Sequence, residues 1–385
     1  MRAGIAGSGF AAEFHLAGLK GCTGLGVRPA AVYSPHAGRR EAFAARHGLA
    51  AAASLEELLG QVDAVHVCAP PATHEKIACA ALAAGVHVIV EKPFTGCFAE
   101  ADTPRAEMEA AAVASARRML AAERAGSATL GYAENWVFAP AVQKEAEIVR
   151  KSRAQILRMA GEESHSGSHS PTYGIWRHSG GGSLVGKACH PLTAILFLKE
   201  EEGRANGGAP IRPATVSARV HALTRLPGYR DAGHLRADYE DIEDCGSLHV
   251  TFADGTVADV FASEIVLGGV YNWLEVFANN HRTRCNLNPI DALHTYNPVE
   301  EQLEDVYVVE KIGTKQGWSQ PAPDEDWMHG YPQELAHFYE CFANGNAPQC
   351  GAELGFVTTA VLYAAYRSAE QGGAEVPVAE LAPAP

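Results

Sequence analysis

Two residues, Lys92 and His190, have the chemistry needed to handle the proton of an alcohol. Removing a hydride from a carbinol carbon requires the hydroxyl proton to leave too, so a base must lie within about 3 Å of the oxygen. A neutral imidazole suits this task near pH 7. A lysine whose ammonium form is disfavoured by a nearby positive charge, such as NAD⁺, could polarise the oxygen or relay the proton. Which of the two residues takes the proton stays open.

The surroundings of both residues predict where they lie. Lys92 follows an apolar run in VIVEKP (88–93), which indicates the carboxyl end of a buried strand. In doubly wound folds, ligands bind at that edge of the sheet. The stretch CAPPATH (68–74) ends the preceding strand at the same edge, where Pro70 and Pro71 would form a rigid turn. His190 lies in an apolar helical stretch after three glycines at 180–182, which would direct it towards the cleft.

A third motif, GSGFAA at 7–12, has the spacing of a dinucleotide-binding turn. Gly7 allows a sharp turn, Gly9 lets a pyrophosphate approach the backbone, and Ala12 keeps the following helix close to the sheet. Around Phe10 and Ala11, the helix N-terminus offers free N–H groups and partial positive charge to phosphates. Without its context, the motif is equally compatible with an ordinary glycine-rich turn.

The elements that must position these motifs form an α/β pattern. Strands predicted at 3–6, 27–33, 64–68, 87–90 and 128–132 alternate with helices, which implies a Rossmann-type, doubly wound parallel sheet. Residues 161–182 are rich in Gly, Ser and His and are predicted to form a loop. Successive strands between 214 and 290 indicate an open, largely antiparallel sheet, and helices return at 331–343 and 354–369. We expect a dinucleotide-binding domain at 1–130 and an α+β substrate-binding and oligomerisation domain at 131–385, whose last helices could pack back on the first.

Composition narrows the class of protein. The chain has 385 residues, 47% hydrophobic and 20% charged, which is typical of a globular protein of two domains. The net charge of −14 argues against nucleic acid or an anionic membrane as the main partner. No apolar run is long enough for a membrane span, and the first strand starts too early for a signal peptide, so a cytoplasmic location is expected. Nine scattered cysteines without a CxxC pair indicate reduced thiols.

The order of these motifs resembles the Gfo/Idh/MocA family of NAD(P)-dependent oxidoreductases along the full chain. It runs GxGxxA, PPATH, EKP, and then GGG with a histidine eight residues beyond. The resemblance implies oxidation or reduction of a secondary carbinol on a sugar or cyclitol. It also implies a set of site residues: a pyrophosphate site at Gly7, Gly9 and Ala12, a nicotinamide site at Pro70, Pro71, His74 and Glu91, and Lys92 and His190 as the acid–base pair.

One position departs from the family pattern. The family usually has an aspartate four residues before the histidine, and this chain has Gly186 there, with Lys187 beside it. Either the carboxylate comes from elsewhere or the substrate is held differently. Candidates are Glu134 and the acidic run 238–244, although such a run is more often a solvated loop. Trp176 and Lys187 are further candidate substrate residues, and Lys187 fits a structural role better than a catalytic one.

The end of the second strand bears on the choice between NAD and NADP. NAD enzymes usually have an acidic residue there for the ribose diol. This chain instead has Ser34, with Arg39 and Arg40 a few residues on. A 2′-phosphate is therefore tolerable, which leans towards NADP. Because a serine can also bind a 2′-hydroxyl, NAD stays open.

Competing readings accompany each feature. Lys92 could be a surface lysine, and His190 a buried structural histidine. His165, His169 and His178 invite a metal hypothesis, but the interleaved Gly and Ser residues favour a substrate-cleft loop, and no metal is expected. Trp318 and the DEDW run at 324–327 could form a carbohydrate-binding rim or simply pack.

Three functions from different classes remain. The leading one is a dehydrogenase acting on a secondary hydroxyl of a sugar, glycoside or cyclitol. The alternative is a glycoside-cleaving enzyme that oxidises a ring hydroxyl transiently and then eliminates the aglycone. The third, a non-catalytic dinucleotide sensor, gives no role to Lys92 and His190. A homodimer or homotetramer is expected, because a broad apolar sheet face in the second domain would need cover.

Overall fold

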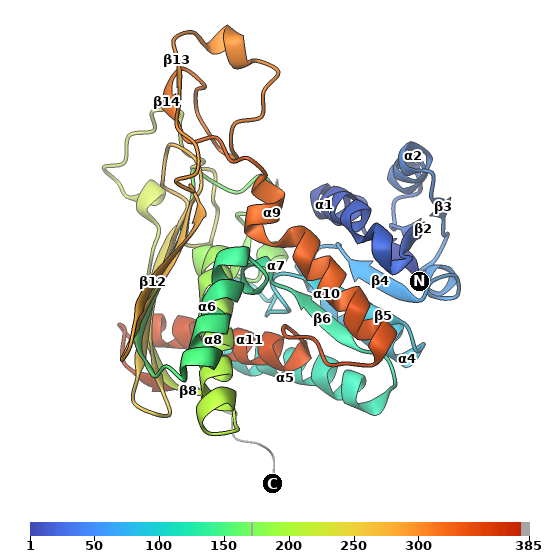
Figure 1. Ribbon diagram of the computed structural model, residues 1–385, viewed down its shortest axis with the longest axis horizontal. Coiled ribbons are helices and arrows are strands. Elements are labelled where there is room, and N and C mark those ends of the chain that lie inside the picture. Colours follow the sequence, from blue (N-terminus) through green and yellow to red (C-terminus); the bar gives the residue numbers. More distant parts are fainter. Residues whose placement is uncertain (171, 379–385) are drawn as a thin grey trace.

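The computed structural model describes residues 1–170 and 172–378, and Figure 1 shows two sheets with helices between and around them. The first sheet has six parallel strands in the order β3-β2-β1-β4-β5-β6. The order reverses beside β1, which creates the edge where a doubly wound sheet binds ligands. The strands are β1 Arg2–Ala6, β2 Arg28–Tyr33, β3 Ala50–Ala51, β4 Ala64–Val67, β5 His87–Glu91 and β6 Leu130–Ala133.

The helices of this part pack on the sheet through small and aliphatic side chains. The buried residues of β4 and β5 are mainly valine, isoleucine and alanine, as expected for a parallel sheet covered on both faces. The helices are α1 Phe10–Leu19, α2 Ala37–His47, α3 Leu55–Leu59, α4 His74–Ala83 and α5 Arg105–Ala125. The predicted Rossmann-type α/β fold is therefore confirmed.

The second sheet has seven strands in the order β12-β11-β7-β10-β9-β8-β15, all antiparallel to their neighbours except β7 and β10. A hairpin turn at 253–255 joins β9 to β10, and Gly255 takes a positive φ of 82° there. The strands are β7 Ile156–Ser164, β8 Pro213–His221, β9 Cys245–Phe252, β10 Val257–Ser263, β11 Tyr271–Ala278, β12 Arg282–Asn288 and β15 Val376–Pro377. The predicted open, largely antiparallel sheet is confirmed.

The loop predicted at 161–182 is wrong in its first four residues, which are part of a strand, and at 176–179, which are helical. Residues 161–164 continue β7, which pairs with β10 on one side and β11 on the other. A stretch with little local strand signal is extended here because both neighbours supply its hydrogen bonds. The end of β7, which carries Glu163, lines the cleft between the two sheets.

Helices cover one face of the second sheet. They are α6 Pro140–Ser152, which the sequence pattern did not predict, together with α8 Cys189–Asn206 and α11 Ala352–Glu370 (Figure 1). A short helix, α7 Trp176–Ser179, and a wider helical turn, Leu184–Ala188, lead into α8. Two further helices, α9 Glu325–His329 and α10 Tyr331–Asn344, connect the second sheet to the first.

The last helices pack on the first sheet's layer. Helix α11 runs against α5, and α10 lies against α1, where the side chain of Leu335 contacts the helix surface at Gly18. A side chain at Gly18 would come within 2.7 Å of Leu335. The domain boundary near residue 130 stays a prediction, because the polypeptide returns from the second sheet to cover the first.

The opposite face of the second sheet carries no helix among the described residues, and its composition corrects the expected broad apolar surface. Arg158 pairs with Asp259 at 3.0 Å, and Asp259 also bonds His249. Arg284 lies over the ring of Trp273 at 4.4 Å. Charged groups and aromatic rings are therefore mixed on this face.

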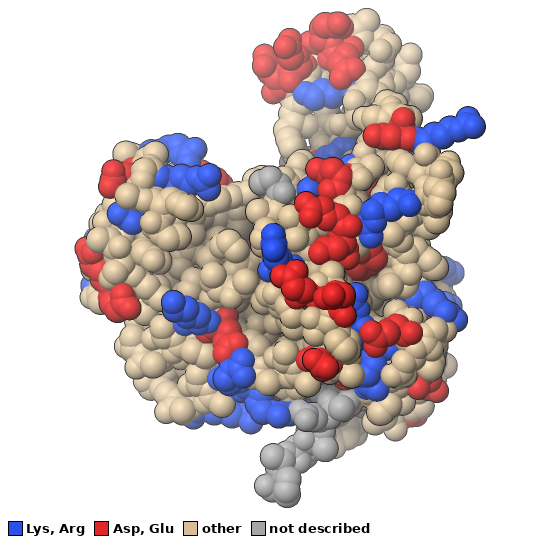
Figure 2. Space-filling view, turned by 180° about the vertical axis from the view of Figure 1, so that it is seen from behind, with Lys and Arg blue, Asp and Glu red and all other residues tan. Residues whose placement is uncertain are grey.

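A projection at the top of Figure 1 carries β13 Thr295–Asn297 and β14 Gly317–Ser319. Trp318 lies there, 75% exposed, against the ring of Tyr296. From behind, the surface is hollowed between this projection and the first sheet's helices (Figure 2). Within the described part of the chain, no helix combines the length and apolarity needed to cross a membrane.

Candidate active site

The turn after β1 has the shape of a phosphate-binding cradle. Gly7 takes a φ of 129°, and a side chain there would overlap the backbone of Cys68. Apart from Gly9 itself and its two chain neighbours, no atom of the described residues lies within 4 Å of the position where Gly9 would carry a Cβ. Gly9 caps α1 without a side chain, so the N–H groups at Phe10 and Ala11 face this open space. These residues fit a diphosphate.

The end of β2 has no acidic side chain for a ribose diol. Ser34 is buried, and its carbonyl oxygen accepts a hydrogen bond from Arg40 at 2.9 Å. Arg39 is exposed at the start of α2. The two arginines therefore differ in role, since Arg40 holds the turn and Arg39 is free to approach a ligand.

His74 ties together the two turns at the carboxyl edge of the first sheet. Its ring nitrogens lie 3.0 Å from the carbonyl oxygens of Pro93 and Ala69. Burial lowers the pKa of His74, so the ring is neutral and donates to one of the two carbonyls. Because its side chain is fully buried, we remove His74 from the groups expected to contact a nicotinamide and assign it to the support of the EKP turn.

A chain of side chains fixes Glu91. The Nε2 atom of His15 lies 2.7 Å from Glu91 Oε1, and its Nδ1 lies 2.6 Å from Nδ1 of His66. His66 in turn contacts the hydroxyl of Tyr339 at 2.7 Å. The other Glu91 oxygen accepts the backbone N–H of Lys92. Although burial alone would raise it, the pKa of Glu91 is lowered by His15, so Glu91 is a carboxylate.

Lys92 reaches across from β5 to the second part of the chain. Its ammonium donates a 3.0 Å hydrogen bond to the carbonyl oxygen of Gly186. Burial alone would lower the pKa of Lys92, but the nearby carboxylates Glu163 and Glu91 raise it. In the protein by itself the ammonium form of Lys92 is therefore favoured. The effect of a bound NAD⁺ on this charge stays a prediction.

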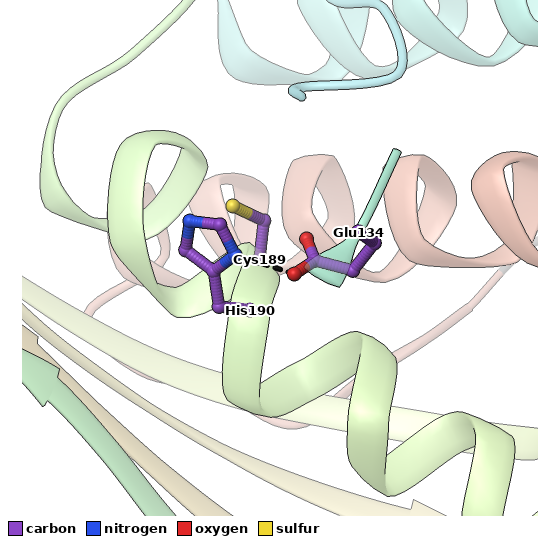
Figure 3. Close-up of side chains that lie close together, drawn as sticks. All are labelled: Glu134, Cys189 and His190. Atoms are coloured by element: carbon purple, nitrogen blue, oxygen red, sulfur yellow. Dashed lines mark hydrogen bonds and ion pairs between the residues drawn. The ribbon is translucent and has the colours of Figure 1, made fainter. Parts of the chain in front are cut away.

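His190 presents one ring nitrogen to Glu134 and the other to the cleft. Nδ1 is hydrogen-bonded to Glu134 Oε1, whereas Nε2 lies 3.6 Å from Glu163 Oε2, too far for a hydrogen bond. Figure 3 shows the second ring nitrogen directed away from Glu134. Burial lowers the pKa of His190 to about 4 and raises the pKa of Glu134 to about 8. At pH 7 the pair therefore carries no net charge, and Nε2 can accept a proton in the tautomer whose Nδ1–H donates to Glu134.

Among the described residues, Glu134, Cys189 and His190 are the group whose donor atoms could hold a metal ion, all within 4.8 Å of one another (Figure 3). Glu134 and His190 are already hydrogen-bonded to each other. Burial raises the pKa of the Cys189 thiol strongly, so it is not a ready thiolate ligand. We interpret the group as an acid–base pair beside a neutral thiol.

The three histidines considered for a metal have separate surroundings. His165 lies 2.7 Å from the ammonium of Lys187, and His169 lies 3.3 Å from Glu310. His178 is exposed at the end of α7. Of the three, only His165 lines the cleft described below.

Two predicted substrate residues have structural positions instead. Lys187 is 1% exposed and pairs with the buried Glu264 at 2.9 Å. Trp176 is also 1% exposed; its indole N–H donates to Cys97 O, and Arg105 covers its ring. Since both side chains are enclosed by protein, we take neither as a substrate contact.

In the acidic run 238–244, the carboxylates at the buried end accept hydrogen bonds from backbone N–H groups and not from a ligand. Glu243 accepts hydrogen bonds from the backbone of Gly182 and Leu184, and so fixes the glycine segment before α8. Asp244 accepts from Leu223 and Thr224. Asp241 accepts from the backbone of Trp176 at 2.6 Å. These carboxylates are therefore not the replacement for the missing aspartate.

One cleft between α1 and the second sheet brings together Lys92 and His190. Glu91, Phe10 and Ala11 line it from the cofactor side. The remaining wall includes residues not singled out from the sequence: Phe14, His15, Asn135, Trp136, Glu163, Asn272, Glu310, His329, Tyr331 and Glu334. Glu163 lies in the stretch that was predicted to be a loop, and Asn272 belongs to no motif that could be recognised in the sequence.

Comparison with known proteins identifies the architecture. A family model described as an oxidoreductase family with an NAD-binding Rossmann fold matches residues 1–121, and that family's C-terminal alpha/beta domain matches residues 163–378. The chain belongs to the Gfo/Idh/MocA oxidoreductase family. Its first domain is accordingly an NAD-binding Rossmann domain, and the resemblance read from the motifs is confirmed.

Several members of this family are similar in sequence over part of the chain. The UDP-N-acetylglucosamine 3-dehydrogenase of Acidithiobacillus ferrooxidans is 38% identical over 102 residues, which are 26% of this chain and 31% of that protein. The inositol 2-dehydrogenase of Leifsonia xyli is 37% identical over 103 residues, 26% of this chain and 30% of that protein. The chain thus matches about a third of the length of these relatives.

Solved structures of the family share the fold over nearly the whole chain. GenD2 from gentamicin A biosynthesis, solved in complex with NAD, has a TM-score of 0.79 at 23% identity, covering 98% of this chain and 96% of that one. The myo-inositol 2-dehydrogenase of Lactobacillus plantarum has a TM-score of 0.72 at 19% identity, covering 98% and 99%. At these identities the likeness concerns the fold.

Proposed function

We propose that this protein is an NAD(P)-dependent dehydrogenase that transfers a hydride between the cofactor and a secondary hydroxyl of a sugar, glycoside or cyclitol. The observation that carries the proposal is the convergence of Lys92 and the free Nε2 of His190 on one cleft, beside the turn that fits a diphosphate. The nearby relatives named as inositol and UDP-N-acetylglucosamine dehydrogenases support the substrate class.

His190 acts as the general base in the direction of alcohol oxidation. Its low pKa keeps the ring neutral at pH 7, and Nε2 is the unprotonated nitrogen when Nδ1–H donates to Glu134, which also fixes the ring's orientation. Lys92, held as an ammonium, donates a hydrogen bond to the reacting oxygen and stabilises the negative charge that develops on it. The bound nicotinamide would supply the hydride acceptor.

The cofactor would lie with its diphosphate at Gly7, Gly9, Phe10, Ala11 and Ala12. Pro70 and Pro71 form the turn after β4 at the same edge, where the nicotinamide end is expected. Because the end of β2 lacks an acid and Arg39 is exposed, we propose that NADP is accepted as well as NAD.

The test is a turnover assay with the purified protein. NAD⁺ or NADP⁺ is incubated with myo-inositol, levoglucosan and UDP-N-acetylglucosamine, and the absorbance of the reduced nicotinamide is followed. We expect reduction with at least one compound, and its loss in Lys92→Met and His190→Asn. Reduction that survives both substitutions would contradict the proposed roles. Substrate consumption without net cofactor reduction would instead favour the glycoside-cleaving alternative.

A further inference from the structure

The wall of the cleft opposite the first sheet contains buried polar atoms that no protein group satisfies. Glu163 is 8% exposed and Asn272 is 5% exposed, and both line the cleft that holds His190. Neither Oε2 of Glu163 nor Oδ1 of Asn272 has a hydrogen-bond partner within the described part of the chain. A buried acceptor without a donor is costly, so two of them side by side indicate a ligand that brings donors.

Strand pairing places the two acceptors together. Glu163 in β7 and Asn272 in β11 are directly opposite each other in the antiparallel ladder. Such pairs project from the same face of a sheet. Here that face is the helix-covered one, because Gly161, two residues before Glu163, lies against Pro191.

The same packing sets the distance between this pair and His190. Pro191 follows His190 at the start of α8, and a side chain at Gly161 would come within 2.9 Å of it. Glycine therefore lets the helix approach the strand, which leaves Glu163 Oε2 3.6 Å from His190 Nε2. Glu163 and His190 both line the cleft, and the separation of Glu163 Oε2 and His190 Nε2 suits two hydroxyl groups on neighbouring carbons.

We propose that Glu163 and Asn272 form a subsite that binds the hydroxyl next to the reacting one, so that the enzyme selects substrates with a vicinal diol. The inference rests on the proposed function and deepens it. The reacting hydroxyl donates to His190 Nε2, and its neighbour donates to Glu163. Glu163 thereby does the work of the carboxylate missing at Gly186, from a strand instead of from the helix.

The burial of Glu163 adds to its selectivity. Burial raises the pKa of Glu163, while the ammonium of Lys92 acts in the opposite direction. A hydroxyl donor would favour the carboxylate form, and a substrate with hydrogen in place of that hydroxyl would leave the group buried and unpaired. Discrimination should therefore come mainly from rejecting the deoxy compound.

The experiment measures binding without requiring turnover. The NADH complex of the full chain is titrated with trans-1,2-cyclohexanediol, 1,3-cyclohexanediol and cyclohexanol, and dissociation constants are taken from ligand-observed NMR. We expect the 1,2-diol to bind about tenfold more tightly than the other two, the factor typical of a hydrogen bond to a charged group. Equal affinities for the three compounds would overturn the proposal.

Three variants locate the effect. Glu163→Gln keeps the side chain's shape and should reduce the preference for the 1,2-diol at least threefold, and Asn272→Ala should also reduce it. Glu162→Gln is the matched control, because Glu162 precedes Glu163 on the other face and bonds Ser164. A preference retained in Glu163→Gln, or lost equally in Glu162→Gln, would refute the subsite. Thermal unfolding of each variant confirms that it folds.

The two proposals fail in distinguishable ways. A diol preference that depends on Glu163, together with no cofactor reduction by any polyol, would retain the subsite and reject the dehydrogenase. Cofactor reduction without any diol preference would retain the dehydrogenase and reject the subsite.

Discussion

His190, the proposed general base, shows how a buried neighbour can tune such a group. Its Nδ1 is occupied by Glu134, and its Nε2 is left for the cleft. Burial raises the pKa of Glu134 to about 8, so it keeps its proton at pH 7, and burial also keeps His190 neutral. Ionisation of Glu134 turns it into a pure acceptor for Nδ1–H, which makes Nε2 a stronger base.

The first prediction follows from this pair. As pH rises through about 8, Glu134 loses its proton, so kcat/KM for alcohol oxidation should increase. Glu134→Gln should remove that increase, because the amide does not ionise. Initial rates from pH 6 to pH 10 provide the measurement. An unchanged rise in the variant would assign the ionisation to another group.

The second prediction separates two lysines. Lys92→Met removes a donor to the reacting oxygen, so kcat/KM should fall about 10²–10³-fold. Lys187→Met leaves Glu264 buried and unpaired and should cost about 3–5 kcal/mol of folding free energy. Rates and urea unfolding of both proteins test the contrast. Equal losses of activity per folded molecule would show that Lys187 also takes part in the reaction.

Helix and strand packing explain the departure from the family pattern at Gly186. A Cβ at Gly186 would come within 2.6 Å of the hydroxyl of Tyr173. The carbonyl oxygen of Gly186 also accepts the hydrogen bond from Lys92. The segment before α7 therefore fills the place where a longer side chain would go, and the carboxylate nearest His190 on the cleft side comes from β7.

The third prediction concerns this position. Gly186→Asp should lower the free energy of unfolding by about 1–3 kcal/mol, because it overpacks the contact with Tyr173. Tyr173→Ala should reduce that cost in the double variant. Urea denaturation of the four proteins completes the cycle. Strictly additive effects would show that the two residues do not compete for space.

At the scale of the whole molecule, the last helices join the two sheets. Helix α10 contributes Tyr339, which extends the His66–His15–Glu91 chain behind the EKP turn. Helix α11 packs along α5. The cofactor side of the cleft is therefore supported by residues from the far end of the chain.

The fourth prediction is that the protein unfolds as one unit. Calorimetry of the full chain should give a single transition, and a fragment of residues 1–130 should not fold cooperatively, because it exposes the surfaces that α10 and α11 cover. Two well-separated transitions would contradict the coupling. The expected homodimer or homotetramer through the second sheet stays a prediction, which light scattering can test on the same samples.

Local sequence carried much of the assignment. The turn at 7–12 depends on glycines at fixed positions, a requirement that few other turns share. The runs of Val, Ile and Ala in β4 and β5 have the composition of buried parallel strands. Lys92 and His190 were identifiable because their flanking motifs are contiguous. Such signals depend on backbone conformation and burial, which neighbouring residues largely set.

Only the tertiary structure decided what surrounds these residues. Glu163 lies in a segment with weak strand character, and it is extended because β10 and β11 pair with it. The burial of Trp176 and Lys187, and the partners of Glu134 and Glu91, depend on contacts between residues far apart in the chain. Burial, charge pairing and the distance between two acceptors are properties of that packing, and the local pattern does not contain them.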